Sequence, residues 1–168
     1  MTIKQLENQE LLLELQKTKF KKNYDRPNVS GRNDELSIKY KKSYGYPCLS
    51  YTFGMVRPRN KPNLQLSVPS VKYPELYQML KDYIHELDPE FKYTHITLNK
   101  NIICKAHVDK FNTSPSLAVG LGDYTGGFLY IKGVKHDIRY NPIIFSGNDE
   151  HWTDEFEGER YSLIYYCL

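Results

Sequence analysis

The stretch Ile143-Ile-Phe-Ser-Gly-Asn-Asp-Glu-His-Trp-Thr-Asp-Glu-Phe-Glu-Gly-Glu-Arg-Tyr-Ser-Leu-Ile-Tyr-Tyr-Cys-Leu168 decides the fold. It holds three short runs of strand-forming residues, at 143–145, 151–153 and 161–168. Gly147-Asn148 and Gly158 separate these runs, and both are turn signals. We therefore expect this end of the chain to consist of short strands joined by tight turns.

The same pattern extends back to residue 93. Further candidate strands lie at 94–98, 102–108, 116–121, 127–131 and 135–140, with turn residues between them. About eight short strands that follow two helical segments predict an α+β domain with a β-sandwich or barrel core.

The N-terminal half contains the two helical segments. Residues 3–20 place apolar side chains among polar ones without Gly or Pro, which predicts an amphipathic helix packed on one side of a sheet. Residues 73–87 give the clearer helix, with Pro74 in its first turn and Asp88-Pro89 at its end. Between them we expect a loop or arm over 23–47, a strand over 48–56 and a loop over 57–69.

The chain length indicates one domain. At 168 residues the protein can bury a single sizeable core. We expect residues 1–92 to supply the N-terminal helices, the basic arm and a supporting strand, and residues 93–168 to supply the β core.

Charge and cysteine content narrow the classes of function. Residues 17–42 carry nine Lys or Arg against three acids, so this segment is either a phosphate-binding arm or a solvated one. The three cysteines are scattered, which favours neither a disulfide framework nor a zinc site. With no long apolar run and no apolar signal-like N-terminus, we expect a soluble, intracellular protein.

His107-Val-Asp109 is the first candidate for metal binding. Residues i and i+2 of a strand project to the same face, so both side chains can reach one ion. An imidazole and a carboxylate are two ligands of the facial triad that holds non-haem iron. The pair alone is weak evidence, because a match is expected by chance in roughly a quarter of chains with this composition.

A third ligand must come from another strand, and His151 and His136 compete for this place. Arg160 follows His151 by nine residues, across the turn at Gly158. An arginine fork on the same interior face would bind the far carboxylate of 2-oxoglutarate, and Ser162 could donate another hydrogen bond. His136 lies only three residues from Arg139 and fits this geometry poorly.

Simpler explanations exist for these residues. His151 is also explained as a histidine on a polar hairpin, and Arg160 as the partner of Glu157 or Glu159 in a surface ion pair, which contributes little. The order of the motifs favours the functional interpretation, since His-x-Asp, His and Arg-x-Ser follow one another at suitable distances along the chain.

With these motifs the chain resembles the iron(II)- and 2-oxoglutarate-dependent dioxygenase superfamily. Within it, the segment from about residue 94 to 168 is similar to the TET/JBP-like nucleobase dioxygenases. The narrower resemblance rests on His107-Val-Asp-Lys-Phe-Asn112, on Gly122-Asp-Tyr-Thr-Gly-Gly127 before an apolar strand, and on Arg160-Tyr-Ser-Leu-Ile-Tyr-Tyr166. The chain departs from the animal enzymes in lacking their cysteine-rich region and in having Leu168 where they have a second base-contacting histidine.

The resemblance implies a double-stranded β-helix, or jelly-roll, core with the N-terminal helices packed on one sheet. It implies that iron(II) is held by His107, Asp109 and His151. The implied contacts to 2-oxoglutarate are Arg160, Ser162, Tyr130 and Asn99. The implied contacts to the substrate are Asn112, which reads a base edge, and Tyr166, which stacks on the base.

The resemblance also implies an activity. The expected reaction hydroxylates the methyl group of 5-methylcytosine or thymine in DNA, with O2 as oxidant, ascorbate as a supporting reductant, and release of succinate and CO2. We expect a monomer in the cytoplasm of a bacterial or phage-infected cell, or in a eukaryotic nucleus. Two alternatives remain open at this stage: a peptidyl prolyl or lysyl hydroxylase, and an inactive domain that binds nucleic acid.

Overall fold

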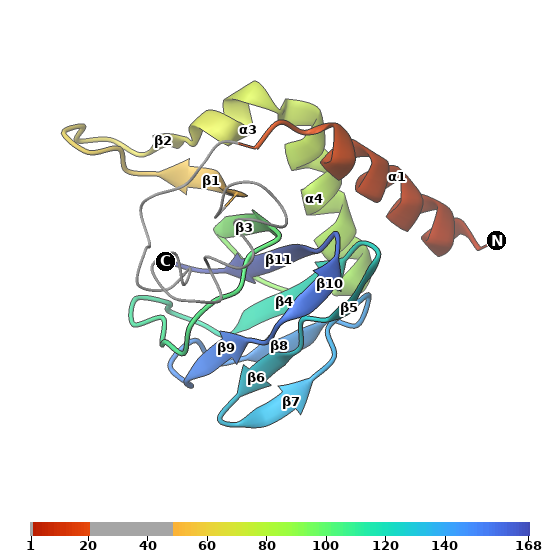
Figure 1. The fold of residues 1–168 in the computed structure, drawn as a ribbon. Coiled ribbons are helices and arrows are strands. Elements are labelled where there is room, and N and C mark those ends of the chain that lie inside the picture. The colour runs from red at the N-terminus through yellow and green to blue at the C-terminus, as the bar shows by residue number, and fades with distance from the viewer. Residues whose placement is uncertain (1, 21–48) are drawn as a thin grey trace.

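The computed structural model describes residues 2–20 and 49–168, without the side chains of residues 3–7. Figure 1 shows a mixed helix and sheet fold in which the helices lie on one side. In chain order the elements are α1 (Ile3–Lys17), β1 (Leu49–Val56), β2 (Gln65–Leu66), α3 (Val68–Lys72), α4 (Pro74–Leu87), β3 (His95–Lys100), β4 (Ser116–Leu121), β5 (Tyr124–Gly126), β6 (Leu129–Ile131), β7 (Val134–His136), β8 (Ile143–Phe145), β9 (His151–Thr153), β10 (Phe156–Gly158) and β11 (Tyr161–Tyr166).

The strands form one large antiparallel sheet and two small ones. The large sheet has the order β2-β1-β3-β11-β4-β8, and its two central strands, β3 and β11, come from segments far apart in the chain. The small sheets are β7-β6-β9 and β10-β5. The β7-β6-β9 sheet lies below the large sheet in Figure 1, on the side away from the helices.

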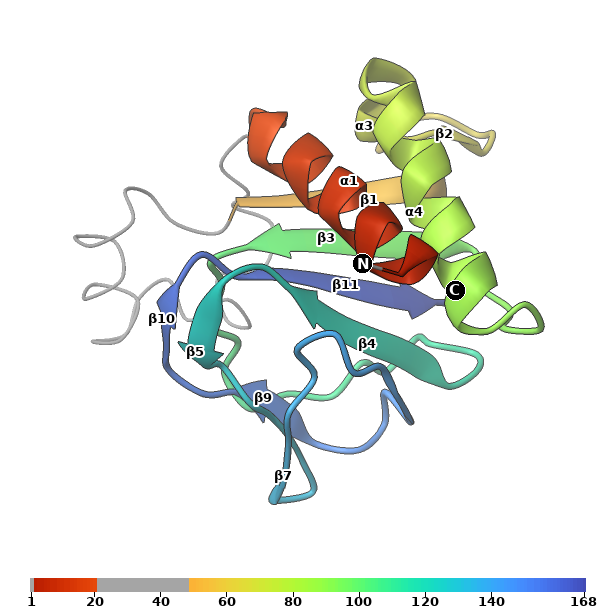
Figure 2. The ribbon, with the colours of Figure 1, turned by 90° about the vertical axis from the view of Figure 1, so that its right-hand side faces the viewer.

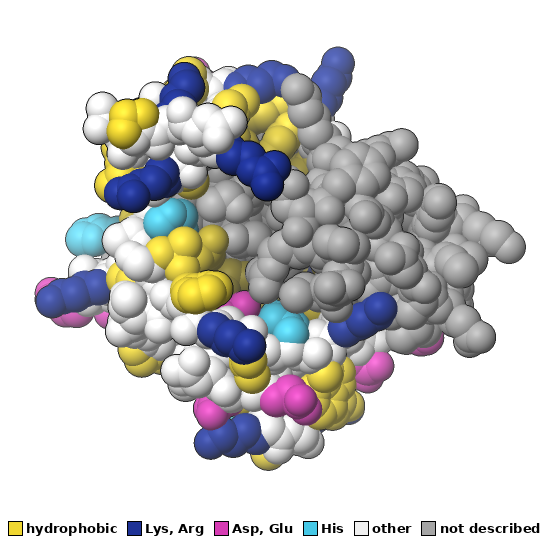
Figure 3. Space-filling view, turned by 90° about the vertical axis from the view of Figure 1, so that its left-hand side faces the viewer, with side chains coloured by type: hydrophobic (Ala, Val, Ile, Leu, Met, Phe, Trp, Pro, Cys, Tyr) yellow, Lys and Arg dark blue, Asp and Glu magenta, His cyan; other side chains and the backbone are white. Residues whose placement is uncertain are grey.

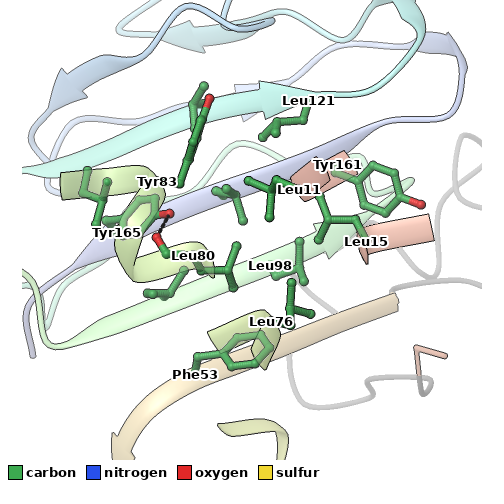
Figure 4. Packing of buried hydrophobic residues seen from close by; sticks show 14 of the residues in the cluster. Leu11, Leu15, Phe53, Leu76, Leu80, Tyr83, Leu98, Leu121, Tyr161 and Tyr165 are labelled. Atoms are coloured by element: carbon green, nitrogen blue, oxygen red, sulfur yellow. Dashed lines mark hydrogen bonds between the residues drawn. The ribbon is translucent and has the colours of Figure 1, made fainter. Parts of the chain in front are cut away.

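The helices cover one face of the large sheet, as predicted from the sequence (Figure 2). Leu11 and Leu15 of α1 and Leu80 of α4 pack against inward-facing residues of the central strands. Figure 4 shows this core, including the hydrogen bond of 2.7 Å that the buried Tyr165 hydroxyl donates to the backbone carbonyl of Leu80. Burial of these side chains holds the large sheet as a rigid platform.

Alternation along the central strands divides their residues between two faces. On β11, Tyr161, Leu163 and Tyr165 enter the helix-covered core. Ser162 and Tyr166 therefore project from the opposite face, because successive strand residues point to opposite sides. The polar face of the large sheet is the floor of the candidate site.

One predicted strand is absent. The segment 102–108 has no regular strand and pairs with β9 at an isolated bridge between His107 and His151. Their reciprocal backbone bonds are 3.0 and 3.1 Å long, but Thr153 then donates to Cys104 and Asp109 to Gly147, so the pairing register slips on both sides of the bridge. Extra residues in a ladder disrupt it. The strand expected here is therefore wrong in form.

This slip also affects the predicted core. The α+β class is confirmed, but the described strands do not close into a double-stranded β-helix. The short strands β5 and β10 were not predicted from the sequence, and the loop expected over 57–69 contains β2 and the first two residues of α3. These elements have two to five residues, too few for hydrophobic periodicity to reveal them.

The described residues bear on the expectations about cysteines, the basic segment and membrane-spanning helices. Among the described residues, Cys104 and Cys167 form no disulfide, while Cys48 and most of the basic segment 17–42 lie outside the described residues. No helix in the described part of the chain is both long enough and apolar enough to cross a membrane.

Candidate active site

A cavity of about 490 Å³ lies between the polar face of the large sheet and the segment that carries residues 102–112. Ser50 and Thr52 of β1, Thr97 and Asn99 of β3, and Ser162 of β11 line its floor. These residues alternate with the core residues of the same strands, so the alternation that builds the helix-covered core also builds the cavity.

His107, Asp109 and His151 meet at one end of this cavity. Their ligand atoms all lie within 4.8 Å of one another. One oxygen of the Asp109 carboxylate is 3.3 Å from Nε2 of His151, and the other is 3.7 Å from Nε2 of His107. Two imidazoles and one carboxylate that converge in this way can hold a divalent metal ion on one face.

Backbone carbonyls orient both imidazoles. Nδ1 of His107 lies 2.6 Å from the carbonyl of Lys105, and Nδ1 of His151 lies 2.7 Å from the carbonyl of Asp149. Since a carbonyl only accepts, Nδ1 must carry the proton in both rings, which leaves the lone pair of each Nε2 directed toward Asp109. Such outer hydrogen bonds are typical of metal-ligating histidines.

The three ligands come from two kinds of local structure. His151 is buried at the start of the regular strand β9 and packs edge-to-face against Phe145. His107 and Asp109 lie in the irregular segment, where three backbone hydrogen bonds hold them. Two form the reciprocal bridge between His107 and His151, and the third, 2.7 Å long, runs from Asp109 N–H to the carbonyl of Gly147. The slipped register thus directs the side chains of His107 and Asp109 toward that of His151.

Arg160 lies in the same cavity and is 3% exposed. Its Nη2 donates to the carbonyl of Gly127 over 3.1 Å, whereas Nε has no hydrogen-bond partner. No carboxylate among the described residues forms an ion pair with it, so the ion pairs with Glu157 or Glu159 considered from the sequence are not made. Burial lowers the pKa of Arg160, but an arginine stays protonated in proteins. Charged side chains buried this deeply are usually paired with an opposite charge.

Ser162 and Asn99 lie side by side on the cavity floor. The two residues are paired in register on β11 and β3, and the Asn99 amide donates to the Ser162 hydroxyl over 3.3 Å. Both line the cavity with Arg160. The structure therefore brings together three of the four residues predicted to contact 2-oxoglutarate.

Tyr130 is not brought to the cavity. It is absent from the cavity lining and stacks on Trp152 with ring centroids 5.1 Å apart and an angle of 4° between the rings. Its neighbours Leu129 and Ile131 belong to a second, smaller cluster of buried hydrophobic residues. Alternation along β6 therefore turns Tyr130 to the other face. His136, the rival metal ligand, lies on β7 and outside the metal-ligand cluster.

Asn112 and Tyr166 both line the cavity. The Asn112 amide donates to Ser116 over 3.1 Å, which fixes the orientation of its carboxamide. The Tyr166 hydroxyl forms a 3.1 Å hydrogen bond with Thr97, and its ring stacks on His95 with centroids 5.4 Å apart. The two predicted substrate residues therefore hold defined positions in the cavity.

Several residues that shape this site were not predicted from the sequence. Thr97 anchors Tyr166, and Phe111, which is 83% exposed, lies on the cavity wall next to the metal cluster. Gly127 leaves room for the Arg160 guanidinium. The glycine pair before an apolar strand was noticed as a motif, but no local signal relates it to an arginine thirty-three residues later.

Comparison with solved structures relates this geometry to a known fold. A structure described as NgTET1 in complex with 5mC DNA matches with a TM-score of 0.57 and 16% identity. The chain shares the fold of NgTET1. The match covers 79% of this chain and 65% of that chain, so the chain spans just under two thirds of the length of NgTET1. The resemblance stated from the sequence is confirmed at the level of the fold.

Two further structures match less well. An oxidoreductase of the 2OG-Fe(II) oxygenase family from Burkholderia pseudomallei has a TM-score of 0.49 and 17% identity over 79% of this chain and 77% of its own. OsALKBH1 has a TM-score of 0.45 and 14% identity over 83% of this chain and 94% of its own. No family model matches the chain. No curated protein matches it in sequence.

Proposed function

We propose that this protein is an iron(II)- and 2-oxoglutarate-dependent dioxygenase that hydroxylates the methyl group of a DNA base. The observation that carries the proposal is one cavity that contains both a cluster of two histidines and an aspartate and a buried arginine without a carboxylate partner among the described residues. We infer that the two facing sheets represent the jelly-roll core implied by the sequence resemblance.

The donor set fits iron(II). His107, Asp109 and His151 supply two nitrogens and one carboxylate, the ligand set of the facial triad, which leaves positions on the metal for a cosubstrate and oxygen. The Nδ1 hydrogen bonds to backbone carbonyls hold both rings in the tautomer that a metal requires.

Arg160 fits 2-oxoglutarate. Its unpartnered Nε and its position in the cavity suit it to bind the far carboxylate of a dicarboxylate whose 2-oxo acid end faces the metal ligands. Ser162, oriented by Asn99, lies on the same strand face two residues on and would donate to the same carboxylate. Tyr130, in contrast, lies outside the cavity lining, so its support for the far carboxylate of 2-oxoglutarate would be indirect.

When bound, iron(II) and 2-oxoglutarate would together supply the oxygen activation for hydroxylation, with succinate and CO2 as coproducts. The residues of the chain bind and orient these groups. The apolar side chains around the metal ligands, including Ile102, Phe145 and Leu129, exclude water from the reacting centre.

A DNA base is the substrate that these residues favour. A base must leave the stack to reach the cavity, and it is then held by stacking and by hydrogen bonds to its edge. Tyr166 offers a ring fixed by His95 and Thr97, and Asn112 offers an oriented amide. NgTET1, which shares the fold, was solved in complex with 5mC DNA.

The test is direct. The protein is incubated with iron(II), ascorbate, 2-oxoglutarate and DNA that carries 5-methylcytosine, and a parallel reaction contains unmethylated DNA with thymine. We expect one oxygen atom to be added to the base, with one succinate formed for each modified base, as measured by mass spectrometry. If only a proline- or lysine-rich peptide were oxidised, the substrate would be a peptide and not DNA. Succinate formation that does not require His107 or Asp109 would contradict the metal site.

A further inference from the structure

A second basic feature, apart from the segment 17–42, projects from the sheet between β1 and β2. Arg57, Arg59 and Lys61 are exposed on this hairpin, which extends beyond the body of the molecule in Figure 1. Residues 53–74 contain four Lys or Arg and no Asp or Glu. Among the described residues, none of the three hairpin cations forms an ion pair. Within the described part of the chain, no acidic side chain neutralises the positive charge of this hairpin.

The charge pattern differs from that of other exposed elements. Helix α4 carries Lys81 together with Glu75, Asp82 and Glu86, a mixture typical of a solvated surface. The hairpin carries one sign only. A surface of one sign attracts partners of the opposite charge over about a Debye length, roughly 8 to 10 Å at physiological salt.

The hairpin has a fixed base. The amide of Gly54 donates to the Ser70 hydroxyl, and the amide of Ser67 donates to the carbonyl of Gly54, each over 2.9 Å. Met55 and Leu66 pair in register on β1 and β2, and Lys61 N–H donates to Pro58 at the tip over 3.2 Å. The three cations are therefore held in a defined place relative to β1.

That place is close to the cavity. Gly54, immediately before the paired base of the hairpin, lies in the same cross-strand row as His95 and Tyr166. Adjacent strands are about 4.8 Å apart, so the backbone of Gly54 at the base of the hairpin lies about 10 Å from the backbone of Tyr166, the residue that we propose to stack on the base. Ser50 and Thr52, earlier on the same strand, line the cavity. In Figure 3, Lys and Arg side chains gather along the upper edge of this face, and others lie lower, among the His and acidic side chains.

We propose that the β1–β2 hairpin binds the DNA backbone next to the base that enters the cavity, with Arg57, Arg59 and Lys61 as the phosphate contacts. The inference rests on the proposed DNA substrate and adds its docking surface. When one base leaves the stack, its own phosphate and those beside it stay outside the pocket, within reach of cations that border it. These contacts position the strand and carry no sequence information.

The test compares a triple variant with a matched control. In the test variant, Arg57, Arg59 and Lys61 are all changed to Gln. In the control, Lys81, Lys132 and Lys135 are changed to Gln, which removes the same charge from α4 and from the β6–β7 hairpin at the other end of the molecule (Figure 1). Binding of fluorescent DNA containing 5-methylcytosine is measured by anisotropy over a range of salt concentrations, together with succinate formation in the absence of DNA.

We expect the triple variant to bind DNA at least tenfold more weakly at about 0.1 M salt. The slope of the logarithm of the binding constant against the logarithm of the salt concentration should be smaller in magnitude by roughly two to three, because each phosphate contact contributes about 0.7 to 0.9 to it. The control variant should keep the wild-type slope, and succinate formation without DNA should be unchanged in both. If the triple variant keeps the wild-type slope, the hairpin inference is overturned while the DNA substrate stands. If the wild-type protein binds no DNA, both are overturned.

Discussion

Gly127 lies directly against the guanidinium of Arg160, so close that a Cβ atom at residue 127 would be 2.7 Å from Nε and 2.9 Å from Cδ. The backbone of Gly127 also has a φ of +64°, which favours glycine. Its carbonyl accepts the hydrogen bond from Arg160 Nη2. One residue therefore provides both the space and a hydrogen bond for the buried cation.

We predict that Gly127→Ala displaces Arg160 and raises the KM for 2-oxoglutarate at least tenfold, equivalent to about 1.4 kcal/mol or more. Iron binding should be retained. The matched control is Gly133→Ala, because Gly133 has a φ of +76° but no atom within 4 Å of the added Cβ. Both variants should lose stability through backbone strain, and only Gly127→Ala should change the KM. Equal KM values in the two variants would contradict the role of the close contact.

Arg160→Ala should have a larger effect on the same parameter. Charge-assisted hydrogen bonds contribute about 1.5 to 3 kcal/mol each, so we expect the 2-oxoglutarate requirement to rise roughly ten- to a hundredfold or more. Metal affinity, measured by calorimetry with iron(II) under anaerobic conditions, should be unchanged. Arg139→Ala is the control, since Arg139 donates to Gly122 at a corner of the fold outside the cavity lining. An unaltered requirement in Arg160→Ala would remove its assigned role.

Alanine substitution of His107, Asp109 or His151 should each abolish metal binding at micromolar concentration and, with it, succinate formation. The reason is that the ligand atoms of all three converge within 4.8 Å. Cobalt(II) absorption provides a readout that does not depend on turnover. His136→Ala should bind cobalt like the wild type, because His136 lies outside the cluster. Loss of binding in that variant would return His136 to consideration as a ligand.

The ring of Tyr166 should matter more than its hydroxyl. Tyr166→Phe keeps the ring beside His95 and removes only the bond to Thr97, whereas Tyr166→Leu removes the ring. Stacking of a base on an aromatic ring contributes about 1 to 3 kcal/mol, so we expect Tyr166→Leu to raise the KM for DNA roughly 5- to 150-fold. Succinate formation without DNA should stay at the wild-type rate in both variants. A KM unchanged in Tyr166→Leu would end the stacking proposal.

Tyr165→Phe should destabilise the fold without affecting the site. The Tyr165 hydroxyl donates to the Leu80 carbonyl in the core, and Tyr165→Phe removes this bond. The cost should be about 0.5 to 1.5 kcal/mol, because the carbonyl lies inside α4 and keeps its helical hydrogen bond. A chain of this size should then unfold roughly 2 to 4 °C lower for each kcal/mol, as measured by calorimetry. Tyr73→Phe, which removes a more exposed hydrogen bond to Lys19, should cost less.

The same residue gives stability a pH dependence. Burial raises the pKa of Tyr165 well above its usual value, so the folded protein holds the proton more tightly than the unfolded chain does. This contribution is complete below the pKa of an unfolded tyrosine, about 10, and is lost as the pH rises above that value. The stability difference between wild type and Tyr165→Phe should accordingly shrink above about pH 10 and stay constant at neutral pH. A difference that narrows at acid pH would contradict this assignment.

Much of the site was predictable because its residues are related by local spacing. Ser162 and Arg160 are two residues apart at the start of one strand, and so are His107 and Asp109 in their segment. Such pairs stay on one side of the chain in extended backbone. In the structure the same alternation places Leu163 and Tyr165 in the core and Ser162 and Tyr166 at the cavity.

Other features depended on contacts between distant segments, which no local pattern specifies. The sequence favoured a regular strand at 102–108, but the backbone bonds to residues 147–153 slip in register and hold His107 and Asp109 in an irregular segment. Tyr130 was assigned to the cavity, yet its position on β6 relative to buried neighbours turns it toward Trp152.

The sequence by itself therefore determined the α+β class, the helix-covered sheet and the residue types of the site, because hydrophobic alternation and short-range spacing are local properties. Only the folded chain shows that Gly127 makes room for Arg160, that the segment carrying His107 and Asp109 is irregular, and that the base of a basic hairpin lies in the row of His95 and Tyr166. These relationships depend on strand pairing and on close packing, which bring together residues far apart in the chain only when the whole core is formed.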